Sequence, residues 1–129
     1  MASNIGDYLA HVIINDLIIA TLTPHLSLHT AAVGDHGTGT EVTGDTYVRK
    51  DLTLDAEIEG ARHTHNTAEI AYVEAGASWG TVGWVGIWDA VTAGGLIAWG
   101  AVTTPKLITI GDTAIVAAGA LTLTFVATP

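Results

Sequence analysis

The chain of 129 residues contains no cysteine, which excludes disulfide bonds and thiolate metal ligands. Positive charge is scarce as well, because 4 Lys and Arg stand against 13 Asp and Glu, giving a formal net charge of −9. An acidic protein repels a phosphate backbone, so we expect no nucleic-acid partner. Aromatic residues make up only 6% of the chain, yet all four tryptophans fall within residues 79–99.

Long hydrophobic runs are also missing. The longest apolar region, residues 8–22, is interrupted by His11, Asn15 and Asp16 and is shorter than the ~20 apolar residues that span a bilayer. We therefore expect no membrane partner. The chain is nevertheless 49% hydrophobic, with a mean hydropathy of +0.44. Because obligate interfaces resemble a domain core, this excess predicts a protein that buries apolar surface against copies of itself.

The length suits one domain, residues 1–129, and the first 22 residues form a distinct N-terminal segment. Apolar residues recur there at helical spacing: Ile5, Leu9, Val12, Ile13 and Leu17. They predict a short amphipathic helix over about residues 4–16, capped by Ser3 or Asn4 and with Asp7 in its first turn. Such a helix packs on the sheet of its own chain or docks on a neighbouring subunit.

Beyond Pro24 apolar and polar residues alternate, which is the pattern of half-buried strands. Strands are predicted at residues 25–30, 47–59, 68–75, 81–88, 95–102, 106–110, 113–117 and 120–126. The glycine-rich residues 31–46 lack an apolar period and predict a long exposed loop. Short strands with frequent turns predict a mainly β fold, an antiparallel β-sandwich of jelly-roll-like form with a short N-terminal helix.

The tryptophan window admits two interpretations. Alternation places Trp84, Gly86 and Trp88 on one strand face, where glycine leaves room for flat indole rings and favours core or subunit-interface packing. Aromatic rings on one strand face can also form a platform for sugars. Trp79, at a strand start beside Gly80, is the candidate exposed ring and therefore the candidate glycan contact.

Three segments carry a resemblance to a known family: GTEVTGDTYVR at 39–49, ASWGTV at 77–82, and GDT followed by AGALT within 111–122. In order and spacing they resemble small tailed-bacteriophage virion proteins commonly labelled phage tail fibre proteins, over nearly the whole chain. The resemblance implies a structural protein, located in the virion, without an active site. The family label does not distinguish the tail from the head surface. The chain departs from the family in the histidines of RHTHNTAE and in Trp88, where we expect Phe.

His63 and His65 are the best metal candidates, because residues two apart on a strand point to one face and both imidazoles could reach one ion. No obvious third ligand accompanies them, so we predict no metal site and interpret the segment as a solvated turn with two polar residues. His25 and His29 lie four apart on a predicted strand, too far apart to chelate one ion, and are expected at the surface.

Acidic residues suggest two further sites, both weakly. Asp35, Glu41 and Asp45 could offer oxygen ligands to calcium, but the ordered EF-hand pattern is missing. Glu57 and Glu59 could act as the acid and base of a glycosidase, but two carboxylates along one strand without a pocket are expected to be solvated. The chain also lacks a Ser-His-Asp signature and a P-loop lysine. We predict no catalytic residue and no cofactor.

Two functions from different classes follow. The first is a non-enzymatic virion subunit, tail fibre-like or a capsid decoration, that assembles by symmetry with itself, preferably as a trimer, and with other virion proteins. In this hypothesis the loop 31–46 stays free to contact the particle or the host. The second is a carbohydrate-binding module that uses Trp79, with Trp84 or Trp99, against host-surface glycans.

Overall fold

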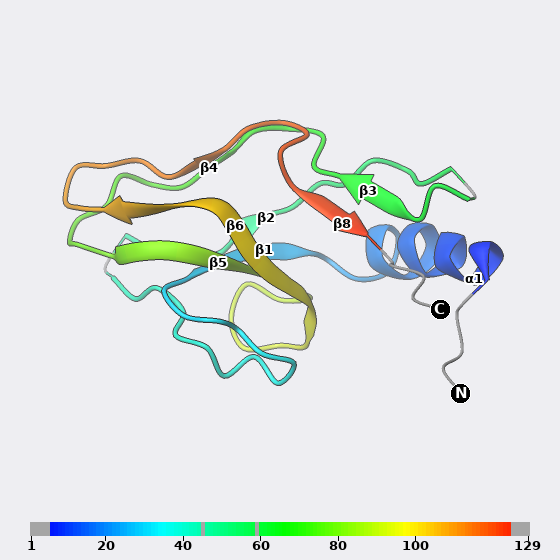
Figure 1. Cartoon of the computed structure of the whole chain (residues 1–129), viewed down its shortest axis with the longest axis horizontal. Helices are drawn as coiled ribbons and strands as arrows, with labels where there is room; N and C mark the ends of the chain where they lie inside the picture. The colour runs from blue at the N-terminus through cyan, green and yellow to red at the C-terminus, as the bar shows by residue number, and fades with distance from the viewer. Residues whose placement is uncertain (1–5, 45, 59, 125–129) are drawn as a thin grey trace.

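The computed structural model describes residues 6–44, 46–58 and 60–124 (Figure 1). The chain begins with α1 (Asp7–Val12), which continues directly as a π-helical segment, η1 (Ile13–Ile19). The strands follow in this order: β1 (His25–His29), β2 (Lys50–Asp51), β3 (His63–His65), β4 (Ile70–Ala71), β5 (Gly80–Trp88), β6 (Leu96–Ile108), β7 (Ile115–Val116) and β8 (Thr122–Thr124).

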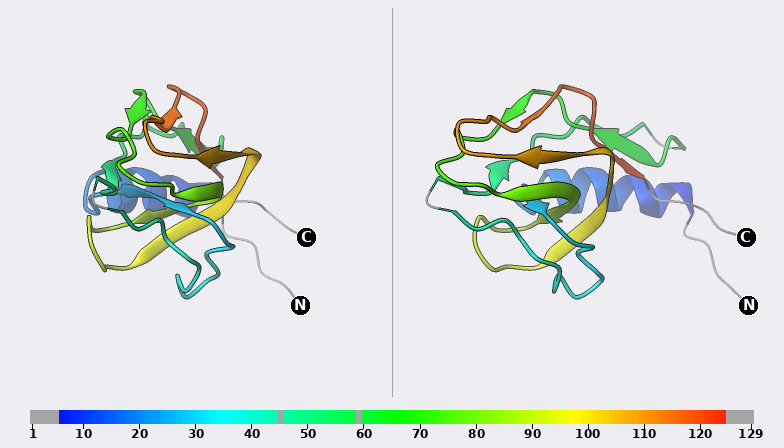
Figure 2. Two further views of the ribbon diagram at one scale, coloured as in Figure 1. Left: turned by 90° about the vertical axis from the view of Figure 1, so that its left-hand side faces the viewer. Right: turned by 60° about the vertical axis from the view of Figure 1, so that its left-hand side comes forward.

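The strands form one four-stranded antiparallel sheet, in the order β2-β1-β5-β6, and two short antiparallel ribbons, β3-β8 and β4-β7. Figures 1 and 2 show the ribbons over one face of the sheet, and the loop after β1 together with the β5-β6 turn over the other. The predicted mainly β, antiparallel fold with a short N-terminal helix is confirmed, in a sandwich-like arrangement.

Strand β1 is buried along its whole length because both of its faces are covered. Leu26 and Leu28 enter the hydrophobic core, and Tyr72 closes over them by donating its hydroxyl to the Leu26 carbonyl oxygen at 2.6 Å. The buried core comprises Ile18, Leu26, Leu28, Val42, Leu52, Leu54, Ile70, Tyr72, Ala75, Trp79, Val82, Ile87 and Ile108. The alternate side chains of β1 therefore lie on the opposite face, where the candidate site forms.

Strand β6 merges two predicted strands, 95–102 and 106–110, into one. Pro105 lies inside it, which is tolerated because β6 is an edge strand and the missing N–H breaks no ladder bond to a central neighbour. The ladder to β5 skips from Lys106 to Ala101, so the residues between them bulge and the strand bends (Figure 1). The predicted strand 47–59, by contrast, is regular only at β2.

The helical segment runs from residue 7 to residue 19, which is later than the predicted 4–16. Asp7 lies in the first turn as predicted, but Gly6 occupies the N-cap position without a side-chain hydrogen bond. The candidate caps Ser3 and Asn4 lie outside the described residues. No helix in the described part of the chain is long and apolar enough to cross a bilayer.

The buried face of this helix is not the predicted one. Ala10, Ile14 and Ile18 are buried, whereas Leu9 and Leu17 of the predicted stripe are 46% and 45% exposed. Because the segment is apolar on nearly all sides, its periodicity could not specify which stripe faces the core. The buried residues lie four apart along α1 and η1, and an apolar stripe that includes Leu9 and Leu17 is left on the outside.

Candidate functional site

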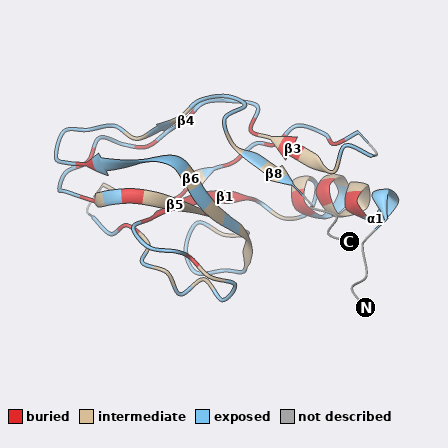
Figure 3. Cartoon of the chain, in the orientation of Figure 1, coloured by how far each residue is buried: buried red, intermediate tan, exposed pale blue. Residues whose placement is uncertain are grey.

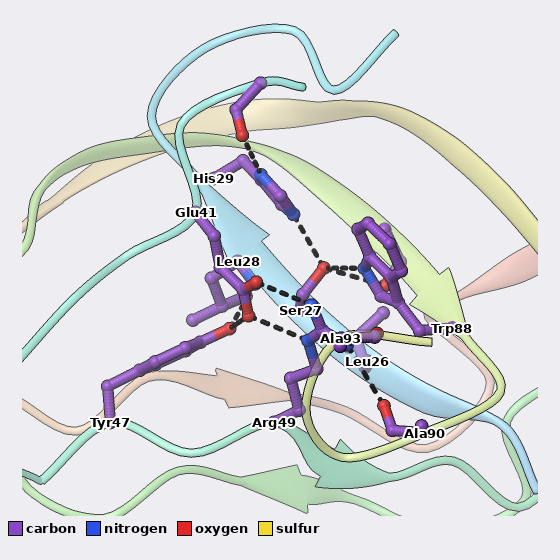
Figure 4. A network of polar contacts seen from close by, with 12 residues as sticks. Leu26, Ser27, Leu28, His29, Glu41, Tyr47, Arg49, Trp88, Ala90 and Ala93 are labelled. Atoms are coloured by element: carbon purple, nitrogen blue, oxygen red, sulfur yellow. Dashed lines mark hydrogen bonds and ion pairs between the residues drawn. The ribbon is translucent and has the colours of Figure 1, made fainter. Parts of the chain in front are cut away.

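The polar side chains of β1 form a buried network on the sheet face opposite the core (Figure 4). Ser27 Oγ lies 2.7 Å from His29 Nε2 and accepts a hydrogen bond from Trp88 Nε1 at 2.7 Å. The Ser27 hydroxyl also donates to the Gly86 carbonyl oxygen at 3.2 Å, and His29 Nδ1 lies 3.3 Å from the Gly39 carbonyl oxygen. The predicted surface position of His25 and His29 is wrong, because a loop covers this face and both residues are buried.

One guanidinium joins this network to two loops. Arg49 donates from Nε and Nη2 to the two carboxylate oxygens of Glu41, at 2.9 and 2.8 Å. Its Nη1 donates to the carbonyl oxygens of Ala90 and Ala93, at 3.1 and 2.8 Å, and its Cζ lies 4.2 Å from the centre of the Trp88 ring. Every nitrogen of this guanidinium has a partner. The side chain therefore ties the loop after β1 to the turn between β5 and β6.

Charges in the network compensate one another. Burial alone would raise the pKa of Glu41, but hydrogen bonds from Arg49 and Tyr47 outweigh burial and lower that pKa. Tyr47 donates to Glu41 at 2.7 Å and accepts from the Leu28 N–H at 3.0 Å, while burial raises the pKa of its phenol far above the usual range. Burial also lowers the pKa of His29. At pH 7 the site holds one carboxylate, one guanidinium and a neutral imidazole.

The glycine-rich loop packs over this network through a few of its residues, while eight of the fifteen described residues of the segment 31–46 are exposed as predicted. Contact of this loop with the particle or the host stays a prediction. Val33 is fully buried and Val42 nearly so. Gly37 has a φ of +67° and lies so close to the Trp88 ring that a Cβ at this position would overlap it. The loop therefore covers part of this sheet face with Val33, Gly37 and Val42, and its other residues are largely exposed.

The Ser27–His29 pair has the spacing of a nucleophile and its base, but it lacks access to a substrate. A catalytic serine must reach its substrate, and both residues are 0% exposed. The hydroxyl also accepts the indole N–H of Trp88. A shallow cavity of about 240 Å³ reaches the ion pair but not the serine; its lining residues are Glu41, Tyr47, Val48, Arg49, Val91, Thr92 and Ala93. This arrangement holds the loops in place and exposes no reactive group.

The two metal candidates do lie together on β3. The rings of His63 and His65 meet edge to face, with 5.0 Å between their centroids. His63 Nδ1 lies 2.9 Å from the Ala61 carbonyl oxygen, and His65 Nδ1 lies 3.8 Å from Asp55 Oδ2. Among the described residues, no group of three or more histidine, aspartate and glutamate side chains is placed to hold one ion. The pair supplies two ligands, and the prediction of no metal at these candidates is not tested by the structure.

Trp79 is not the exposed ring, contrary to expectation. It is 5% exposed and lies in the core, edge to face with Tyr47 and Tyr72 at centroid distances of 5.5 and 6.3 Å. Its indole nitrogen is buried and has no hydrogen-bond partner among the described residues. In this conformation the ring has no face on which a sugar could stack, because neighbouring side chains cover it.

The exposed indole belongs to Trp99, which is 39% exposed. Its ring packs against Trp84 with centroids 5.8 Å apart and planes tilted by 43°. Its Nε1 donates to Asp35 Oδ1 at 3.0 Å, which fixes the ring against the glycine-rich loop. The tryptophans thus divide between the two interpretations: Trp79 and Trp88 pack inside, and Trp99 faces solvent.

The acidic candidates do not form the predicted sites. Asp35 and Glu41 bind different partners, an indole and a guanidinium, and Asp45 lies outside the described residues. The expectation that Glu57 is solvated is wrong, because its side chain is fully buried and one carboxylate oxygen lies 2.9 Å from His11 Nδ1. Glu59 lies outside the described residues. Glu57 therefore secures the N-terminal helix.

A family model described as podophage GP4 fiber I protein gp80 matches residues 4–124. The chain belongs to this family. The resemblance to phage fibre proteins is thereby confirmed, and this fibre protein is a structural protein of the virion. A search of curated proteins found no match.

Sequence reasoning missed the central polar network of the fibre protein. One signal was present: the segment 39–49, which carries the most specific part of the resemblance, contains Glu41, Tyr47 and Arg49. Spacing alone could not show that these side chains converge, because they are brought to Trp88 by the fold of the loop.

Proposed function

We propose that this fibre protein is a non-enzymatic subunit that works in a symmetric homo-oligomer, with a trimer as the expected state, and that docks on other virion proteins. The observation that supports it is that the side chains of the polar network are hydrogen-bonded to one another and lie beneath a loop. The groups capable of chemistry, Ser27, His29, Glu41 and Arg49, are bonded to one another and shielded from substrate. The surface offers apolar side chains instead, which suit contact with other subunits.

Light scattering coupled to size-exclusion chromatography tests this proposal on the full chain. We expect one oligomer whose mass is an integer multiple of 13.3 kDa and which persists on dilution to micromolar concentration. We also expect antibodies to the chain to label phage particles, on the tail for a fibre and over the head for a capsid decoration. A monodisperse monomer that does not associate with particles contradicts the proposal.

Glycan binding is the second candidate function, and the exposed ring of Trp99 favours it. The ring is held by Trp84 on one side and by Asp35 at its nitrogen, so a sugar would meet an already ordered platform. Titration with host cell-wall sugars should change the fluorescence of the wild type but not of Trp99→Ala, whereas Trp79→Phe should retain the change. The absence of any change in the wild type removes this candidate.

A further inference from the structure

The last quarter of the described chain, residues 96–124, lacks a covering layer. Among residues 96–124, Ile108 alone is buried, although β5 next to it holds four buried residues in nine. Figure 3 shows the exposed colour along most of β6 and β8. The uncovered side chains are large: Leu107, Ile110 and Ile115 are 61%, 71% and 56% exposed. Large apolar side chains that gather in one exposed region mark a candidate interaction surface.

An open cavity of about 690 Å³ lies in this region, between the β5-β6 hairpin and the segment 113–123. Its walls are mainly apolar and include Val82 and Val85 from β5, Val102 from β6, and Val116 from β7. Protein interiors are normally packed without voids of this size. The cavity between the two layers therefore resembles a hydrophobic core that one chain does not fill and that a second molecule could enter.

Charge indicates which molecule fits. Of the 13 acidic residues, only Asp112 lies within residues 96–124, and Lys106 is the sole lysine or arginine there. Two copies of a chain with a net charge of −9 repel each other through most of their surfaces. The nearly uncharged face is the one through which they can approach closely.

We propose that this face, residues 96–124 with the cavity behind β6, is where a second copy of the chain docks. The inference rests on the proposed homo-oligomer and specifies its contact surface. The outer edge of β6 has no ladder partner in the described part of the chain. Pro105 and Lys106 lie at one end of this edge, where proline and lysine disfavour the addition of another strand. Residues 96–101 contain no proline or charged residue, so their outer edge is free to pair with a strand of the second copy.

Three single substitutions, each introducing one negative charge, test this surface by light scattering on the full chain. Val102→Glu and Ala120→Glu place a carboxylate on opposite walls of the cavity. Ile58→Glu is the matched control, because Ile58 is 80% exposed and does not line the cavity. Ala120 is exposed, so its substitution leaves the fold of the single chain intact, which circular dichroism verifies.

We expect Val102→Glu and Ala120→Glu to raise the dissociation constant of the oligomer about 100-fold or more, since an unpaired charge would be buried among acidic copies. Ile58→Glu should associate like the wild type. A wild-type oligomer that both cavity variants preserve overturns the proposed face and leaves the proposed function standing. Dissociation by Leu17→Glu alone also overturns the face, since it places the contact on the outer stripe of the helix. A monomeric wild type refutes the homo-oligomer itself.

Discussion

Replacing Arg49 with methionine tests whether the buried ion pair holds the two loops together. The change keeps an aliphatic chain of similar length but removes the charge and the four hydrogen bonds to Glu41, Ala90 and Ala93. Removing one member of a buried pair costs about 3–5 kcal/mol. Because the Glu41 side chain keeps 25% of its surface in water, we expect about 2–3 kcal/mol of lost stability.

Urea unfolding followed by tryptophan fluorescence measures this loss, at one fixed protein concentration because association also stabilises the chain. A loss of this size lowers Tm by about 8–12 °C for a domain of this length. Lys50→Met is the matched control: it removes the same charge from the next residue and should change stability by less than about 1 kcal/mol.

A second substitution separates the pair from the packing of the side chain. In the Arg49→Met background, Glu41→Gln should recover part of the loss, because it removes the carboxylate that was left unpaired. The reasoning is refuted if Arg49→Met costs no more than Lys50→Met, or if Glu41→Gln adds its full cost to that of Arg49→Met.

Three further predictions concern other parts of the structure. Burial lowers the pKa of His29 in the folded chain. As pH falls below about 6.5, the His29 imidazole therefore becomes protonated more readily in the unfolded chain than in the folded chain. The free energy of unfolding should therefore fall between pH 6.5 and 5, with a smaller slope in His29→Gln. Gly37→Ala should destabilise more than Gly111→Ala: both residues have positive φ, but only the first Cβ overlaps a ring, so Gly111→Ala should cost about 1–2 kcal/mol. For His63 and His65, calorimetric titration with Zn²⁺ should show no tight binding and EDTA should leave Tm unchanged, because two histidines are fewer than the three or four protein ligands of a zinc site.

The sequence predicted which segments form strands, but it did not predict which strand faces are covered by loops. Alternation at Leu26 and Leu28 correctly predicted β1 and its core face. It also placed Ser27 and His29 on the other face. We expected that face to be exposed to solvent, because polar residues usually lie at the surface. Burial of that face depends on the loop 31–44 folding back, which is a tertiary event that local pattern does not encode.

The helix and the tryptophans show the same limit. Seven of the ten residues from Leu9 to Ile18 are apolar, so their spacing allowed more than one buried stripe. The hydrogen bonds between Asn15 and Glu57 are tertiary contacts that this spacing does not reveal. Trp79 and Trp99 have similar local surroundings in sequence, with small neighbours on both sides. Only their distances from Tyr47 and from Asp35 distinguish the inner ring from the outer one.

The guanidinium of Arg49 links the loop 31–44 to the turn 89–95, so neither segment can be exchanged without regard to the other. A designer who grafts the loop 31–44 from a relative, to alter what the fibre meets, must carry over the matching turn 89–95 as well. The carbonyls of Ala90 and Ala93 and the carboxylate of Glu41 share a single cation, so a change in the backbone course of either segment would remove hydrogen bonds that link it to the other. Diversity in these two segments would therefore arise in pairs.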